Sequence, residues 1–255
     1  MALPVRLSAV RALLKELSVS GESGKPLVVG GARELAGVLR RELARGAAPG
    51  GVRPDDAPEG AAVLVYVVGA TDDEAALKRA RRARVPIVAV APPELDSVPY
   101  VLATDVVRVP AGEGFPIETI LKVVAGRLGE EAAPLAARVP LLRRAVAAEL
   151  VRTFAAKNGA VGAAVFVSGA DLPVLALNEL RLLLRLEQAY GRKVQLREQV
   201  AVAAGAALGL RALARRLLEL VPAARWAVQG AVAYAGTRAL GEAAVARLES
   251  APRGH

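Results

Sequence analysis

The sequence predicts an α/β domain followed by an all-α domain. Short, continuous apolar runs alternate with helical patterns over the first half of the chain, as in successive βα units of a parallel sheet. The strand-like runs end before Pro134, and long helical patterns fill the rest of the chain. Residues 1–133 carry equal numbers of basic and acidic side chains, so the whole net charge of +9 lies in residues 134–255. Such asymmetry is typical of two domains with different surfaces.

The first half is expected to contain a helix and then the α/β domain. Residues 1–20 predict an amphipathic helix, because Leu and Val recur at helical spacing between charged residues. This pattern differs from that of a signal peptide, which has an uninterrupted apolar core. The α/β domain is expected at residues 25–129. Its strands are predicted at Leu27–Gly31, Val63–Gly69, Val85–Ala91 and Val106–Pro110, and its helices at Ala32–Arg45, Asp72–Arg84 and Pro116–Leu128.

These elements predict a four-stranded, mainly parallel sheet of the Rossmann-like or P-loop-like type, with flanking helices. The helical domain is expected at residues 134–250, with the boundary near Gly129–Pro134. Its first helix is predicted at Ala133–Gly159. The others are predicted at Pro173–Gly191, Val194–Leu220 and Ala223–Glu249. Pro is tolerated in the first turn of a helix, and Gly suits the position just after its end.

The helical half contains apolar stretches, but they are short for a membrane span. The longest uncharged run is Asn158–Ala170, whereas a spanning helix needs about 20 apolar residues. Such lengths suit buried helices, or segments that lie in or dip into a bilayer. Small residues also recur at every fourth position, at Ala201, Gly205 and Gly209 and again at Ala227, Ala231, Ala235 and Ala239. Stripes of this kind let helix backbones approach closely in membranes or in tight bundles.

The composition excludes several kinds of site. There is no Cys, so disulfides and thiolate metal sites are excluded. The only His is His255, at the end of the chain, which argues against Ser-His triads and His-rich metal sites. Aromatic residues make up 3% of the chain, leaving few side chains on which nucleic-acid bases could stack. We expect no cofactor and no metal, and the few aromatic residues argue against a nucleic-acid partner.

The segment Lys25–Leu43 opens like a phosphate-binding loop, with a buried strand, two glycines and a helix. A P-loop needs G-x-x-x-x-G-K-[ST], in which the Lys reaches the phosphates and the hydroxyl binds magnesium. Counted from Gly30, Ala36 takes the lysine position and Gly37 the hydroxyl position. We interpret Gly30, Gly31, Ala36 and Gly37 as a degenerate remnant of a phosphate loop. A tight strand-to-helix turn is favoured over a working anion site.

The acidic run that follows the second predicted strand suggests a metal site at first. However, Thr71 and Glu74 have the spacing of a capping box, and Asp72 and Asp73 suit the positive first turn of a helix. A magnesium ion would also need a phosphate partner, which the degenerate loop does not supply. We therefore assign these residues to helix capping.

Two segments of the first half carry a family resemblance. "VLVYVVGATDDEAALKRARRARVPIVAVAPPELD" reads as strand, helix and strand, and "VVRVPAGEGFPIETILKVVAGRL" as strand, loop and closing helix. Together they resemble an Era-type GTPase domain that has lost its nucleotide chemistry. Ala91, Pro92, Pro93 and Glu94 stand near the family's guanine-reading N-K-x-D, and Pro110–Ala111 stands in place of its Ser-Ala. Between Arg45 and Ala61 the family would fit switch I, two strands and D-x-x-G, whereas here we expect a loop without strands.

The second half, from about Val139 to Glu249, carries another resemblance. "LPVLALNELRLLLRLEQAYG", with the preceding "SGAD", and "WAVQGAVAYAGTRALGEAAVARLE" resemble domain-of-unknown-function family 697. That domain follows GTPase domains in bacterial proteins and occurs in YcjF-like membrane proteins. Its marks here are Gly169–Ala170–Asp171, Tyr190–Gly191 and Gly236–Thr237 through Gly241. The resemblance implies association with a GTPase-like domain and with a membrane, and it implies no catalytic residues.

These observations favour a non-enzymatic pseudo-GTPase joined to a helical domain with a scaffold or regulatory role. The alternatives are a nucleotide-binding enzyme with an atypical phosphate loop and, second, a nucleic-acid-binding protein. The expected partner is an anionic membrane surface or a protein, and a homo-oligomer is also considered. Arg211, Arg215 and Arg216 are the candidate surface, because they lie close together on one predicted helix. We expect the protein at the cytoplasmic side of the membrane, peripheral or integral, or soluble in the cytoplasm.

Overall fold

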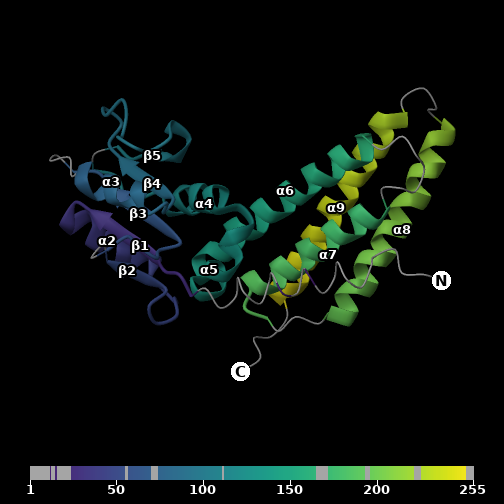
Figure 1. The fold of residues 1–255 in the computed structure, drawn as a ribbon, viewed down its shortest axis with the longest axis horizontal. Coiled ribbons are helices and arrows are strands. Elements are labelled where there is room, and N and C mark those ends of the chain that lie inside the picture. The colour runs from purple at the N-terminus through teal and green to yellow at the C-terminus, as the bar shows by residue number, and fades with distance from the viewer. Residues whose placement is uncertain are drawn as a thin grey trace. The chain divides into compact units, whose positions relative to one another are not determined.

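The computed structural model describes residues 24–54, 57–69, 74–110, 112–164, 172–192, 196–220 and 225–250, together with Ala12 and Lys15. The chain divides into two compact units (Figure 1). The α/β unit contains Glu22–Glu149 and Ala189–Gly191, and the helical unit contains Leu150–Gln188 and the chain from Arg192 onward. The helix expected at residues 1–20 lies outside the described residues, except that Ala12 and Lys15 are helical. The domain bounds 25–129 and 134–250 stay a prediction.

The α/β unit is built on a five-stranded, wholly parallel sheet in the order β2-β1-β3-β4-β5. The parallel sheet with flanking helices is as predicted, but the predicted count of four strands is wrong. The strands are β1 (Leu27–Gly31), β2 (Val52–Pro54), β3 (Val63–Val67), β4 (Ile87–Ala91) and β5 (Val106–Arg108).

The additional strand is β2, which lies in the segment where we expected only a loop. Val52 pairs with Leu27, so β2 extends the edge of the sheet beside β1. The strand is only three residues long, is at least partly exposed, and ends in Pro54. A proline is tolerated on an edge strand, because the N–H that it lacks would face away from the sheet. A strand so short and so polar gives no continuous apolar run, which is why the pattern missed it.

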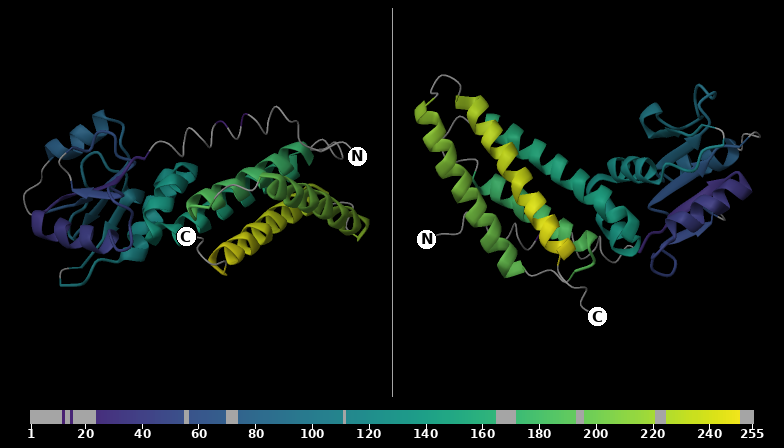
Figure 2. Two further views of the ribbon diagram at one scale, coloured as in Figure 1. Left: turned by 90° about the horizontal axis from the view of Figure 1, so that it is seen from below. Right: turned by 180° about the vertical axis from the view of Figure 1, so that it is seen from behind.

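Helices cover both faces of the sheet, as the connections require. The chain moves one way from β1 to β2 through α2 (Arg33–Leu43) and the other way from β3 to β4 through α3 (Glu74–Arg82). Since such crossovers are right-handed, the two helices lie on opposite faces, as Figure 2 shows in its left panel. β3 and β4 are buried along their whole length. On the face covered by α3, Leu77 packs into a cluster with the sheet residues.

The α/β unit ends in a group of short helices. These are α4 (Ile117–Leu128), α5 (Ala132–Arg138), the 3-10 turns around them, and the start of α6 (Arg143–Ala164). The single helix predicted over Ala133–Gly159 is therefore wrong, because it is interrupted between α5 and α6. The cause is Pro140, which opens a 3-10 turn and disfavours a helical conformation for the residue before it.

The helical unit contains the rest of α6 with α7 (Leu172–Ala189), α8 (Leu196–Leu220) and α9 (Arg225–Ser250). The three last helices agree with the predicted ranges to within a few residues. Helices α8 and α9 pack side by side (Figure 2, right panel). Close approach of α6 and α9 requires glycine: a Cβ at Gly162 would lie 2.9 Å from the carbonyl oxygen of Gln229. Among the described residues, none of these helices is both long and apolar enough to cross a bilayer.

Candidate functional site

The carboxyl ends of β1 and β3 are the first place to look for a site. In doubly wound sheets, ligands bind in a crevice beyond the carboxyl ends of the strands, where the strand order reverses. The order β2-β1-β3 places this reversal between β1 and β3. The segment that we interpreted as a degenerate phosphate loop begins at the same point, because Gly30 and Gly31 are the last two residues of β1. Sequence and topology therefore identify the same edge of the sheet.

The two strands are closed together at this edge. Gly31 has a φ of +101°, and a Cβ there would lie 1.9 Å from the carbonyl oxygen of Val67 on β3. The next residue, Ala32, donates its backbone N–H to the same oxygen at 2.9 Å. A Cβ at Gly69, just beyond β3, would come within 3.2 Å of the Cβ of Ala32. Gly31 is thus required by backbone contact between two strands of the sheet.

The residue in the lysine position of a phosphate loop faces the interior. Ala36 is buried, with 7% of its surface exposed, so its side chain points into the core of the α/β unit. Gly37 is partly exposed. The residue before helix α2, Ala32, provides no side-chain cap, and Glu34 lies in the first turn of the helix. That carboxylate balances the positive end of the helix dipole from within the chain, where a phosphate loop would have a bound anion.

The loops beside this edge are tied down by side chains. Arg108 of β5 donates to the backbone carbonyl oxygens of Pro92 and Asp96, each at 3.1 Å. This fixes the loop after β4, where the GTPase family would read guanine. Tyr100, at the end of that loop, donates its hydroxyl to the carboxylate of Glu74 at 2.9 Å. The proposed capping residues Thr71, Asp72 and Asp73 lie outside the described residues, as does Ala111.

No protein-family model matches this chain, and no curated protein or solved structure shows significant similarity to it. The resemblances to the Era-type GTPase domain and to domain-of-unknown-function family 697 therefore stay hypotheses. Among the residues that the structure describes, no three His, Cys, Asp or Glu side chains lie together in a way that could hold a metal ion.

The interior of the helical unit contains polar side chains. Asn178 on α7 donates to Asn158 on α6 at 2.8 Å, and Asn158 donates to the hydroxyl of Thr237 on α9 at 2.8 Å. Asn158 and Thr237 are completely buried. These bonds connect three helices, and buried networks of this kind specify a single packing when every member has a partner. The periodicity did not identify them, because α7 carries apolar residues around its whole circumference.

Glu179, beside Asn178 on α7, carries a buried carboxyl group. Its exposed fraction is 0%, and within the described part of the chain neither of its carboxylate oxygens has a hydrogen-bond partner. Burial raises the pKa of Glu179 to about 8 from an ordinary value of 4.5. An uncompensated buried carboxylate is costly, so the group takes up a proton instead. The sequence showed a polar residue here but gave no sign of its burial.

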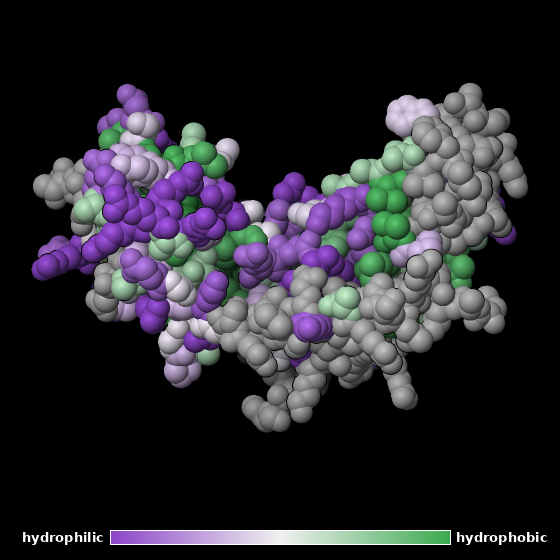
Figure 3. Space-filling model, viewed as in Figure 1, coloured by the Kyte–Doolittle hydropathy of each residue, from purple (hydrophilic) through white to green (hydrophobic). Residues whose placement is uncertain are grey.

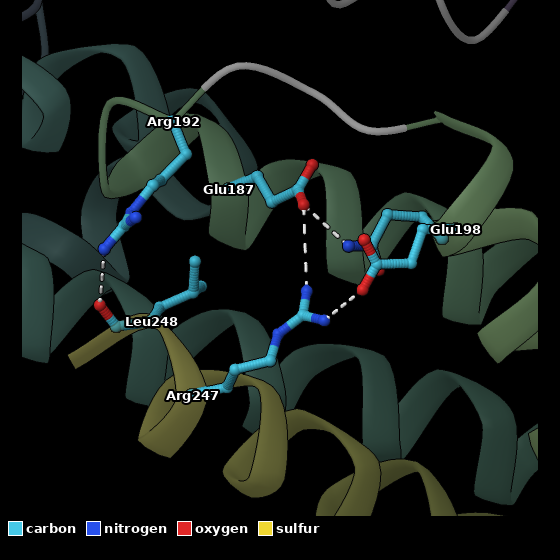
Figure 4. Close-up of polar contacts among 6 residues, drawn as sticks. Glu187, Arg192, Glu198, Arg247 and Leu248 are labelled. Carbon is cyan, nitrogen blue, oxygen red and sulfur yellow. Dashed lines mark hydrogen bonds and ion pairs between the residues drawn. The ribbon is translucent and has the colours of Figure 1, made fainter. Parts of the chain in front are cut away.

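An ion cluster fixes the beginning of α8 against its neighbours (Figure 4). Arg247 of α9 reaches between Glu187 of α7 and Glu198 of α8, with Nη2 3.9 Å from the Glu187 carboxylate and Nη1 paired with Glu198. Gln199 of α8 donates to Glu187 at 2.6 Å. Arg192, also labelled in Figure 4, donates to the Leu248 carbonyl oxygen at 3.3 Å. The cluster joins the first turn of α8 to α7 and α9.

The predicted basic surface lies on α8, near its carboxyl end. Arg211, Arg215 and Arg216 all fall within this helix. Arg216 is exposed, whereas the side chains of Arg211 and Arg215 lie outside the described ones. On the face drawn in Figure 3, hydrophilic side chains prevail over the α/β unit. The helical unit offers a different surface, because Val202 and Leu208 of α8 are 38% and 44% exposed.

Proposed function

We propose that this protein is a non-enzymatic pseudo-GTPase, in which an α/β domain without nucleotide chemistry is joined to a helical docking domain. The observation that carries the proposal is the closed edge between β1 and β3. Gly31 and the bonded oxygen of Val67 occupy the turn, and the buried Ala36 takes the position of the phosphate-binding lysine. Both features suit a close-packed strand-to-helix turn better than a phosphate cradle.

The helical unit is the part that we propose to bind a partner. The excess of basic side chains in this unit favours an anionic partner. Because the proposal assigns no catalytic groups to the protein, the role that we propose for it is a scaffold or regulatory one. Two marks of family 697 have structural roles that are consistent with membership. Gly191 has a φ of +68° just after α7, and a Cβ at Gly241 would lie 2.6 Å from Val151 on α6. Gly169, Ala170 and Asp171 lie outside the described residues.

The partner that we propose first is an anionic membrane surface, bound at its cytoplasmic side through α8. Arginine stems can lie in apolar surroundings while their guanidinium groups reach the headgroups. Each cation near such a surface contributes on the order of 1 kcal/mol. Replacing Arg211, Arg215 and Arg216 together by Gln should therefore weaken binding to anionic vesicles well beyond tenfold. The measurement is co-sedimentation with phosphatidylserine-containing vesicles at low and high salt.

A matched control removes the same charge from the other unit. Arg79, Arg81 and Arg82 are exposed on α3, and their triple Gln variant should bind vesicles like the parent, apart from a general charge effect. If the two triple variants lose vesicle binding equally, net charge alone accounts for the interaction. A parent protein that does not sediment with vesicles would leave a protein as the proposed partner.

A further inference from the structure

Among the described side chains of α8, those on the outer face form an exposed apolar strip that lies between Glu198 and Arg216. At about 100° per residue, the exposed positions among the α8 side chains that the structure describes fall within one face about 120° wide. They are Glu198, Ala201, Val202, Gly205, Leu208, Gly209, Ala212 and Arg216. The six residues between the two charged ones are all apolar or glycine. A Cβ at Gly205 or at Gly209 would meet nothing within 4 Å.

Packing against the described part of the chain does not explain the two glycines. The glycines of the α6–α9 crossing are needed because a Cβ there would touch the facing helix. At Gly205 and Gly209 there is room for a larger side chain, and glycine in a helix interior costs about 1 kcal/mol relative to alanine. Glycines four residues apart let a second helix approach closely. A facing helix on this strip would therefore give the two glycines a role.

The charged residues at the two ends of the strip indicate which helix packs against it. Glu198 and Arg216 lie on the same line of the helix surface, about 27 Å apart along its axis. In an antiparallel pair of α8 helices, the register that sets Glu198 of one copy opposite Arg216 of the other forms the same pair at both ends. That register also sets Gly205 opposite Gly209 and Val202 opposite Ala212. All three pairs are symmetric about position 207, as a two-fold interface requires.

From this complementarity we infer that the protein forms a two-fold symmetric dimer through the outer faces of antiparallel α8 helices. The glycines bring the backbones together at the centre, Val202, Leu208 and the alanines fill the flanks, and Glu198–Arg216 pairs close both ends. Arg216 has no ion-pair partner within the described part of its own chain. Glu198 is held by Arg247, but its side chain is 44% exposed and so can accept a second cation.

A lipid surface fits the strip less well. Helices that lie in an interface bury bulky side chains such as Trp, Phe and Leu, whereas the centre of this strip is Gly and Ala. The area of one helix face is small compared with the roughly 1,000 Å² of a stable interface. The dimer is therefore weak and depends on protein concentration. This inference does not rest on nucleotide or vesicle binding.

The test is Gly205→Leu, with Gly126→Leu as the matched control. Gly126 is an exposed glycine of α4 that also has nothing within 4 Å of a Cβ. Both changes should stabilise a helix, because Leu has the higher helix propensity, so loss of folding would not complicate the result. In sedimentation equilibrium over a wide concentration range, the parent and Gly126→Leu should dimerise and Gly205→Leu should stay monomeric. A monomeric parent, or a dimer that survives Gly205→Leu, overturns the inference.

Cross-linking tests the register, and the absence of native Cys makes every introduced thiol unique. In the inferred dimer, Val202 faces Ala212 of the other copy, while its own counterpart lies about 15 Å away along the axis. With a short thiol cross-linker, a mixture of Val202→Cys and Ala212→Cys proteins should form heterodimers, and neither variant alone should cross-link. Efficient cross-linking of either variant to itself contradicts the antiparallel register. Vesicle binding that becomes stronger in Gly205→Leu, without any dimer in the parent, would assign the strip to lipid instead.

Discussion

Replacing Gly31 by alanine should remove most of the stability of the α/β unit. The new Cβ would lie 1.9 Å from the carbonyl oxygen of Val67, and this atom belongs to the backbone of a buried strand, so it cannot move aside as a side chain would. Relief would require breaking the bond from Ala32 to that oxygen and separating β1 from β3. The φ of +101° adds backbone strain. We expect a loss of about 4 kcal/mol or more in the free energy of unfolding.

Gly46→Ala is the control for this change. Gly46 also has a left-handed φ, +69°, but a Cβ there would meet nothing within 4 Å, so its substitution measures the backbone strain alone, about 1 kcal/mol. Amide hydrogen exchange in peptides that cover β1 and β3 gives the local opening free energy for both variants. Similar protection in Gly31→Ala and Gly46→Ala would show that β1 and β3 do not touch as described.

Glu179→Gln should stabilise the helical unit at neutral pH and remove a part of its pH dependence. The pKa of Glu179 is about 8 in the folded state and 4.5 in the unfolded chain. Between these two pH values, its carboxyl group is therefore protonated in the folded state and ionised in the unfolded chain. The folded state then holds one more proton, so stability is fully present below pH 4.5 and falls as pH rises towards 8. The slope is about 1.4 kcal/mol per pH unit. Gln cannot ionise and lacks this slope.

The expected gain in the free energy of unfolding at pH 7 is about 3 kcal/mol, shrinking to below about 1 kcal/mol at pH 5. Urea unfolding at several pH values between 5 and 8, followed by the fluorescence of Trp226, measures the helical unit specifically, since Trp226 is the only Trp. Glu118→Gln is the control, because Glu118 is exposed on α4. If Glu179→Gln and the parent lose stability in parallel as pH rises, the carboxyl group is not buried as described.

The parts of the fold that could be predicted from the sequence are those with a clear hydrophobic pattern. β1, β3 and β4 are continuous apolar runs, so a buried parallel sheet followed from their composition alone. β2 was missed because an edge strand of three residues has neither an apolar run nor an alternation. The break at Pro140 was missed because the residues on both sides have the same helical pattern. Local patterns identify long elements and overlook short interruptions.

For the candidate sites too, the sequence indicated some features and the structure was needed for the others. The sequence identified the glycine turn, but only the contact between Gly31 and Val67 gives the reason for the glycine. The recurrence of Ala201, Gly205 and Gly209 was visible, whereas their exposure was not. The burial of Glu179 depends on helices that pack around α7 from distant parts of the chain. The spacing of residues along one helix does not show how many other helices pack against it in the fold.

The most direct test of the proposed function is a titration of the whole protein with nucleotide. We predict that neither GTP nor ATP, each with Mg²⁺, gives measurable heat in isothermal titration calorimetry at physiological concentrations. The closed turn at Gly31 and the buried Ala36 leave no lysine and no hydroxyl for the phosphates and the metal. Saturable binding of either nucleotide with micromolar affinity would contradict the account. It would make the uncapped start of α2 a phosphate site and favour the nucleotide-binding alternative.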